Sequence, residues 1–179
     1  MTLAVPVPAQ VAPGEFDTGA LWNANVFNGL TYLLNPPMAF LYQATAQSIA
    51  NATFVPLTWD SELSDTYGGH STVTNTSEYT AQVGGTYLVM GSVGFVENSS
   101  GIRLVCIGKN GSYTTLYGVV DAVTTNSVTN GYASTAGLVT LNAGDYIQLN
   151  GYQTSGNTGG LATATGWQCS SLSVLWVHA

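Results

Sequence analysis

From Met38 onward, the sequence is a series of short apolar or alternating runs separated by clusters of Gly, Asn, Asp and Ser. Thr, Ser, Asn and Gly are poor helix formers, whereas short runs that alternate between apolar and polar residues are typical of half-buried strands. The number and spacing of these runs favour an antiparallel sandwich or barrel of about eight to ten strands. We therefore predict that residues 38–179 form an all-β jelly-roll sandwich.

The candidate strands cover residues 38–43, 53–59, 77–82, 84–95, 102–109, 113–120, 126–141, 145–153 and 171–179. Asn110-Gly111 stands between two of these runs, and this dipeptide indicates a tight hairpin. Pro56 has no backbone N–H to donate, so the run that contains it is predicted to lie at an edge or a bulge.

The first 37 residues have a different character. Three prolines within residues 3–14 predict an extended arm over residues 1–17. Residues 18–35 predict a short amphipathic helix, which Asp17 or Thr18 can cap and Pro36-Pro37 ends. Its apolar side chains are candidates for attachment to a larger assembly: Trp22, Val26, Phe27, Leu30, Leu33 and Leu34. The alternative is a helix that folds onto its own domain.

Charge excludes one class of partner. Two basic residues stand against nine acidic ones, whereas binding to phosphates requires clustered Lys and Arg, so we expect no nucleic-acid partner. No apolar run is long enough to span a membrane, and the first residues lack the pattern of a signal peptide. A soluble product made in the cytoplasm, without a membrane partner, is the expectation.

Ionisable residues gather in one place only. Asp60, Glu62, Asp65 and His70 fall within eleven residues of each other. Their oxygens could bind calcium, although the spacing is not that of an EF-hand loop. Alternatively, they brace the loop through hydrogen bonds, and we predict no metal or other cofactor.

The sequence argues against an enzyme. His70 and His178 are the only imidazole bases, and no serine has the G-x-S-x-G context of a hydrolase nucleophile. Three further carboxylates, Asp121, Asp145 and Glu97, are dispersed along the chain, and a pair of them for glycoside hydrolysis is the alternative that the sequence leaves open. We therefore name no catalytic residue.

Cysteines and tryptophans leave alternatives open. Cys106 and Cys169 lie in apolar runs, and we favour free thiols over a disulfide. The four tryptophans could stack on a carbohydrate or fill the core and an interface between chains. These residues are Trp22, Trp59, Trp167 and Trp176.

Four stretches, taken together, resemble the tumour-necrosis-factor-like fold, and in particular the bacterial and phage relatives of the complement-type globular head. They are residues 54–70, Gly85-Thr86-Tyr87, Lys109-Asn110-Gly111 and residues 141–149. Residues 13–37 separately resemble the leader of many actinobacteriophage virion proteins, in which a Pro-Gly-Glu segment and a short helix lead to Asn-Pro-Pro.

The resemblance implies a homotrimer in which one sheet of each subunit packs around the threefold axis. Apolar residues on both faces of the run 85–95, and almost throughout the last run, are compatible with such packing. The candidate contacts between subunits are Tyr87, Val89, Leu172, Val174 and Trp176.

The expected function is that of a phage virion structural protein. We predict a capsid decoration protein that docks on the major capsid protein through residues 1–37 and stabilises the shell. It would be located in the virion, assembled in the host bacterial cytoplasm, with weak contact to a host cell-surface glycan. The alternative is a minor tail protein, a tail-tip fibre knob that joins a tail protein and binds a host receptor.

Overall fold

Two layers of antiparallel strands, preceded by one short helical segment, make up the fold. The computed structural model describes residues 5–8, 12–14, 16, 18–113, 117, 121–124 and 131–179, with only the backbone of residues 121–124. The predicted all-β jelly-roll sandwich is confirmed.

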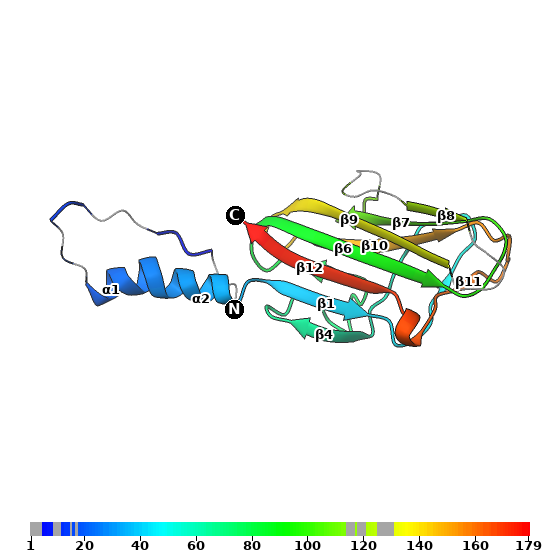
Figure 1. Ribbon diagram of the computed structural model, residues 1–179, viewed down its shortest axis with the longest axis horizontal. Coiled ribbons are helices and arrows are strands. Elements are labelled where there is room, and N and C mark those ends of the chain that lie inside the picture. Colours follow the sequence, from blue (N-terminus) through cyan, green and yellow to red (C-terminus); the bar gives the residue numbers. More distant parts are fainter. Residues whose placement is uncertain are drawn as a thin grey trace.

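The first layer, which we call the front sheet, faces the viewer in Figure 1. All its strand pairs are antiparallel. The order of its strands is β4 (Ser61–Asp65), β1 (Met38–Tyr42), β12 (Ser171–His178), β6 (Gly85–Phe95) and β9 (Gly131–Leu141).

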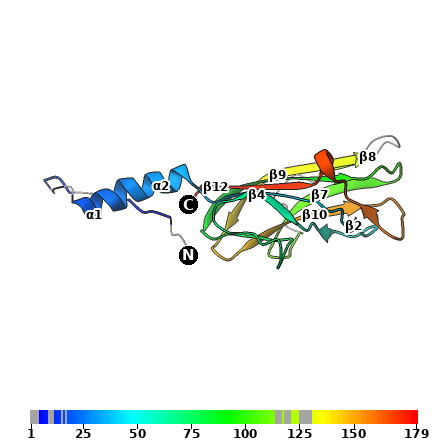
Figure 2. The same cartoon turned by 90° about the horizontal axis from the view of Figure 1, so that it is seen from below.

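The second layer, the back sheet, lies behind the front sheet, and Figure 2 shows the two layers edge-on. The order of its strands is β3 (Val55–Pro56), β10 (Tyr146–Gln153), β7 (Ile102–Lys109) and β8 (Asp121–Thr124), and β5 (Tyr79–Thr80) also pairs with β10. The remaining elements are a small ladder of β2 (Ser48–Ile49) and β11 (Leu161–Ala162) and the 3₁₀-helix η2 (Gly166–Gln168).

The hydrophobic core lies between the two sheets, because every second side chain of each long strand points inward. Its fully buried aromatic residues come from the front sheet, the back sheet and the loops that join them. They are Trp59, Tyr79, Tyr87 and Phe95.

The structure confirms the predicted hairpin at Asn110-Gly111 and the predicted edge position of Pro56. Asn110 and Gly111 both adopt positive φ angles, 50° and 77°, and Lys109 donates its N–H to the Ser112 carbonyl at 2.9 Å, which closes the hairpin. Pro56 lies in β3, an edge strand of the back sheet. Most of the predicted strand 113–120, and residues 126–130 of another, lie outside the described residues.

The helical segment extends from one end of the sandwich along its long axis (Figures 1 and 2). It begins with α1 (Gly19–Trp22), continues as the π-helix η1 (Asn23–Phe27) and ends with α2 (Asn28–Leu34). Thr18 caps it, since Leu21 donates its N–H to Thr18 Oγ1 at 3.2 Å. Among the described residues, no helix has the length and apolar character needed to cross a bilayer.

Candidate functional site

A row of apolar side chains crosses the outward surface of the front sheet. Met38, Leu175, Leu88 and Leu138 occupy adjacent register positions on β1, β12, β6 and β9. Leu138 is 63% exposed, and Met38 and Leu175 are more than one third exposed. Phe40 and Met90 lie in the next row. We call these six residues, Met38, Phe40, Leu88, Met90, Leu138 and Leu175, the apolar patch.

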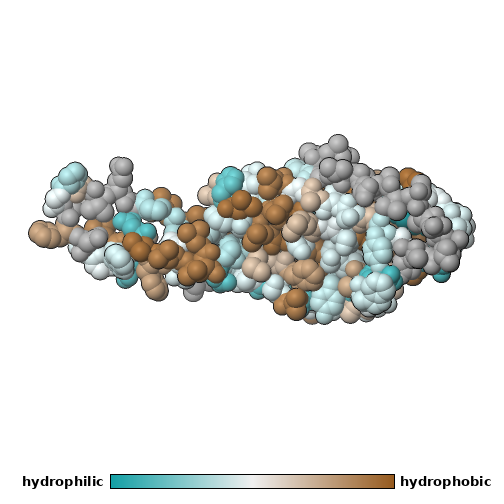
Figure 3. Space-filling model, in the orientation of Figure 1, coloured by the Kyte–Doolittle hydropathy of each residue, from teal (hydrophilic) through white to brown (hydrophobic). Residues whose placement is uncertain are grey.

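The front sheet becomes polar with distance from the helix. The third row consists of Tyr42, Ser171, Ser92 and Ser134, and the Ser92 and Ser171 hydroxyls lie 3.1 Å apart. Figure 3 shows apolar atoms gathered over the half of the sheet next to the helix and paler, polar atoms over the other half. An uncovered apolar area of this kind marks an interaction surface, because water contact with it is unfavourable.

The five residues predicted to contact other subunits do not belong to this surface. The structure buries Tyr87, Val89, Leu172, Val174 and Trp176 in the core of the single chain, where the most exposed of them, Trp176, reaches only 8%. Side chains alternate along a strand, so the prediction chose the inward face of β6 and β12 instead of the outward one. Ser92, Ser171 and Ser173 lie on the outward face of β6 and β12. These polar residues could have shown from the sequence which face of each strand points away from the core.

The predicted attachment residues lie on the helical segment, and most are exposed. Trp22, Phe27, Leu30 and Leu33 are each more than half exposed, and Leu34 is 85% exposed; Val26 is partly buried. We call these six residues the apolar side of the helix. It is the second large apolar surface that the single chain leaves uncovered.

A tight joint connects the helix to the sandwich. Tyr32 is buried and packs edge-on against Trp176, with ring centroids 4.9 Å apart, and against Tyr67 at 6.2 Å. Burial raises the pKa of Tyr32 well above its ordinary value. The Trp176 N–H donates to the Pro37 carbonyl at 2.9 Å, and Thr66 Oγ1 donates to the Pro36 carbonyl at 2.8 Å. The helix is therefore fixed relative to the front sheet.

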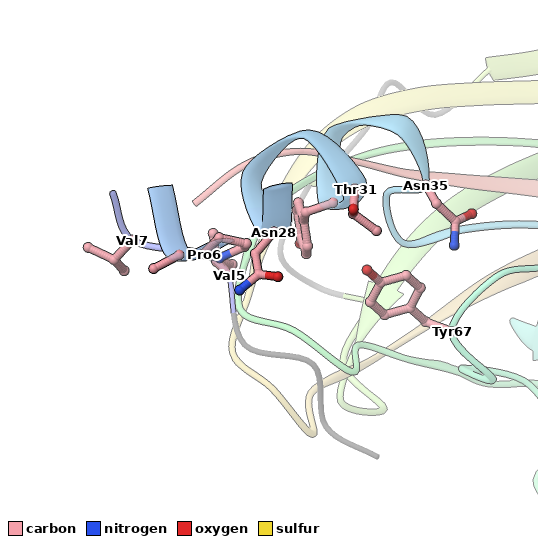
Figure 4. Close-up of a pocket in the computed structure, with 9 residues that line it drawn as sticks. Val5, Pro6, Val7, Asn28, Thr31, Asn35 and Tyr67 are labelled. Atoms are coloured by element: carbon pink, nitrogen blue, oxygen red, sulfur yellow. The ribbon is translucent and has the colours of Figure 1, made fainter. Parts of the chain in front are cut away.

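Three described residues of the arm lie along the other side of the helix. Val5, Pro6 and Val7 line a cavity of about 510 Å³ together with Asn28, Thr31, Asn35 and Tyr67, which Figure 4 shows in close-up; Ala24 and Tyr32 complete the lining. Figure 2 places these described arm residues on the side of the helix away from the outward surface of the front sheet. Val5, Pro6 and Val7 therefore leave the apolar side of the helix uncovered.

The acidic loop is held by hydrogen bonds within the protein. Asp60 accepts from the Ala44 and Thr45 N–H groups at 2.7 and 2.8 Å. Burial alone would raise the pKa of Asp60, but these bonds outweigh it and the pKa is lowered. Asp65 accepts from the N–H of His70 at 2.8 Å.

The two His70 ring nitrogens lie 2.9 Å from the Glu78 carbonyl and 3.2 Å from the Trp59 carbonyl, and Glu62 is exposed on β4. Within the described part of the chain, no three His, Cys, Asp or Glu side chains come together as metal ligands. The observed contacts of Asp60, Asp65 and His70 are those of a braced loop.

Two of the stretches that carried the resemblance meet at the turns. Asp145 forms an ion pair with Lys109 at 2.8 Å and accepts from Asn110 Nδ2 and the Asn142 N–H, both at 2.8 Å. These partners, the Lys109 side chain first, hold the pKa of Asp145 well below its ordinary value.

The other ionisable and reactive groups are dispersed. His178 lies at the end of β12, Glu97 is exposed after β6, and the side chain of Asp121 lies outside the described residues. Cys106 and Cys169 are free, which confirms that prediction; burial raises the pKa of the Cys106 thiol to about 11. The described residues therefore assemble no nucleophile, base and orienting group.

The tryptophans divide among three environments. Trp59 and Trp176 are buried in the core, Trp22 belongs to the helix, and Trp167 on η2 is 91% exposed. In Figure 2, η2 rises above the front sheet in the half of the sandwich remote from the helix. Trp167 is thus the tryptophan that is free to stack on a ligand in that half.

Comparisons with solved structures identify the fold. The globular domain of zebrafish complement 1qA matches with a TM-score of 0.57 and 13% identity, over 79% of this chain and 98% of that one. Murine APRIL at pH 5.0 matches with a TM-score of 0.58 and 13% identity over the same shares, and murine APRIL at pH 8.0 gives 0.55 and 14%. No family model and no curated protein matches the sequence. The fold is a tumour-necrosis-factor-like jelly roll.

Proposed function

We propose that this chain is a non-enzymatic structural protein of a bacteriophage particle, in which three copies form a knob that decorates the capsid. The observation that carries the proposal is the apolar patch, large side chains on four of the five strands of the front sheet, most of which the single chain leaves exposed. The resemblance of residues 13–37 to the leader of virion proteins supplies the connection to a phage.

Self-association explains the patch best. A continuous apolar area on one sheet is covered when identical subunits pack around a symmetry axis. The resemblance implies a threefold axis, and a trimeric knob matches threefold or quasi-threefold positions on an icosahedral shell. The charge-poor sequence is consistent with an interface that has few like charges to bring together.

Attachment to the particle is assigned to the N-terminal segment, residues 1–37, and its partner would be the major capsid protein. This segment extends from one end of the sandwich and leaves the loops at the other end free (Figures 1 and 2). Three linked contacts are together much tighter than one. Binding to the assembled shell in preference to free subunits stabilises the shell by mass action. The protein would be located in the virion after assembly in the host bacterial cytoplasm.

One observation favours the second candidate, a tail-tip knob attached to a tail protein. Trp167 is 91% exposed on η2, in the half of the sandwich remote from the helix, where it could contact a receptor or cell-surface glycan. Stacking of an aromatic ring on a sugar, with hydroxyl-bearing neighbours, is a typical mode of glycan binding.

The copy number per purified particle tests both candidates. Quantitative mass spectrometry against the major capsid protein should find copies on the order of hundreds for a decoration protein at icosahedral positions. A tail-tip knob predicts roughly three to a few tens of copies. Absence from purified particles would refute both.

A further inference from the structure

The apolar side of the helix and the apolar patch face the same way. Figure 3 looks onto the outward surface of the front sheet and shows apolar atoms over both the helix and the adjoining half of that sheet, with the helix continuing the long axis of the sandwich. The two surfaces therefore stand side by side along one face of the molecule. A partner that packs on the patch would therefore also lie next to the apolar side of the helix.

The π-helix aligns the apolar side chains. Within η1, the Asn28 N–H donates to the Asn23 carbonyl, five residues back rather than four. Each π turn holds about one residue more than an α turn, so residues five apart are brought toward one side. Trp22 and Phe27 are five residues apart, and Leu30 lies three residues after Phe27, close to one α-helical turn. An unbroken α-helix would rotate Phe27 away from Trp22.

The chain itself provides no cover for this side among its described residues. The arm residues Val5, Pro6 and Val7 lie against Asn28 and Thr31, on the other side of the helix (Figure 4). Leu33 and Leu34 remain 67% and 85% exposed. Among the described residues, arm residues therefore lie against one side of the helix, and none of them covers Leu33 or Leu34.

The joint prevents the helix from moving independently of the front sheet. Tyr32 packs on Trp176, and Trp176 is bonded through its backbone to Pro37. A symmetric association of front sheets therefore also brings the helices of the copies together. The helix is suited to such contact, because residues 18–35 contain no charged side chain that would be repelled by its own copy.

We propose that the apolar side of the helix packs against the same side of the helices in two other copies, forming a three-helix bundle that extends the trimeric knob. The inference rests on the proposed self-association of the front sheet and adds a second contact to it. It reassigns Trp22, Phe27, Leu30 and Leu33 from the particle to the trimer. Contact with the particle is then left to residues 1–17.

Disulfide trapping in the full chain tests the bundle directly. Leu33→Cys is made in a Cys169→Ser background, since Cys106 is buried, and the protein is oxidised at low micromolar concentration. The bundle predicts covalent dimers on a non-reducing gel, because two thiols near a threefold axis can pair. Asn28→Cys is the matched control: it is also exposed on the helix but faces the arm, and it should remain monomeric on the gel.

A second pair of variants tests the energetic contribution of the helix. Leu30→Asp with Leu33→Asp should raise the dissociation constant of the trimer on the order of 100-fold or more, because charge is placed in an apolar contact. Ala24→Asp with Asn28→Asp introduces the same charge on the arm side and should change it by less than about threefold. Near-ultraviolet circular dichroism confirms that each variant keeps a folded sandwich.

The outcomes separate this inference from the proposed function. If Leu33→Cys gives no dimers and the aspartate variants remain trimeric, the bundle is refuted while a trimer held by the front sheet stands. If those trimeric variants also lose particle binding, the apolar side contacts the particle instead. A full chain that is monomeric in solution would refute the trimer, and the bundle with it.

Discussion

Each of the few charged side chains that the structure describes near the turns and the core has a specific bonding role. Asp145 forms an ion pair with Lys109 and accepts hydrogen bonds from Asn110 and Asn142 at the end of the back sheet. Arg103 is fully buried. The Arg103 guanidinium donates to the Ser100 and Ile102 carbonyls at 3.1 and 3.0 Å. At this scale, the charged groups of Asp145 and Arg103 stabilise the fold through bonds within the protein.

Asp145→Asn tests the turn cluster. At pH 7 the substitution should lower the free energy of unfolding by about 1–3 kcal/mol, because it removes an ion pair and weakens charge-assisted hydrogen bonds. The pKa of Asp145 is lower in the folded than in the unfolded protein, so its contribution is fully present above the unfolded pKa of about 3.9.

That contribution is lost as the pH falls through the folded pKa of Asp145. Urea unfolding at pH 7, 4 and 2.5 should therefore show a difference between the two proteins that shrinks with acidification. A difference that is constant with pH would contradict the account.

Arg103→Ala tests the buried cation. It should lower the free energy of unfolding by about 3 kcal/mol, because it leaves a cavity and removes the donor of two partly buried hydrogen bonds to backbone carbonyls. Arg103 also lies 5.6 Å from the centre of the Phe95 ring. Arg103→Lys should recover less than half of the lost free energy of unfolding, since a single ammonium group does not reproduce the planar set of guanidinium donors. Full recovery by lysine would show that charge alone matters.

The thiols should differ in reactivity. Cys106 is buried and its pKa is raised to about 11, so almost none of it is thiolate at pH 8, whereas Cys169 is only partly buried. We expect a thiol reagent such as dithionitrobenzoate to modify Cys169 first and Cys106 only after unfolding. Cys169→Ser provides the control, and rapid modification of that folded variant would contradict the burial of Cys106.

At the scale of the elements, the outward face of the front sheet should bind other copies without being needed for folding. Leu138 is 63% exposed in the single chain. Leu138→Asp should therefore change the unfolding midpoint of the monomer little, yet weaken self-association on the order of 100-fold. Thr140→Asp, also exposed on β9, is the matched control outside the apolar patch. Equal weakening by both variants would show that the effect is not specific to the patch.

The sequence was sufficient to predict most strands, the hairpin at Asn110-Gly111 and the helix, because each has a local signal. It did not show which face of β6 points inward, since Tyr87 and Leu88 are equally apolar neighbours and only packing against the back sheet decides between them. The π turn at 23–27 also has no local signal in the residues. The five residues predicted to contact other subunits therefore face the core of the single chain, and an interface on the outward face of β6 and β12 stays a prediction.

At the scale of the whole molecule, one elongated face combines the apolar patch with the apolar side of the helix (Figure 3). Assembly depends on surfaces of different chains meeting, which no local pattern within one chain encodes. The proposed particle contact lies at the helical end of the molecule, and the exposed Trp167 lies in the half of the sandwich remote from it. In the proposed knob, the end that carries the N-terminal segment attaches to the particle, and the opposite end of the sandwich faces the surroundings.

The mass of the full chain in solution is the most direct test that the apolar face is covered by copies of the same chain. Sedimentation equilibrium at low micromolar concentration should give three times the 18.6 kDa of one chain. Leu138→Asp in the same run should shift the mass toward a single chain. A wild-type mass of 18.6 kDa at concentrations up to about 100 μM would contradict the account.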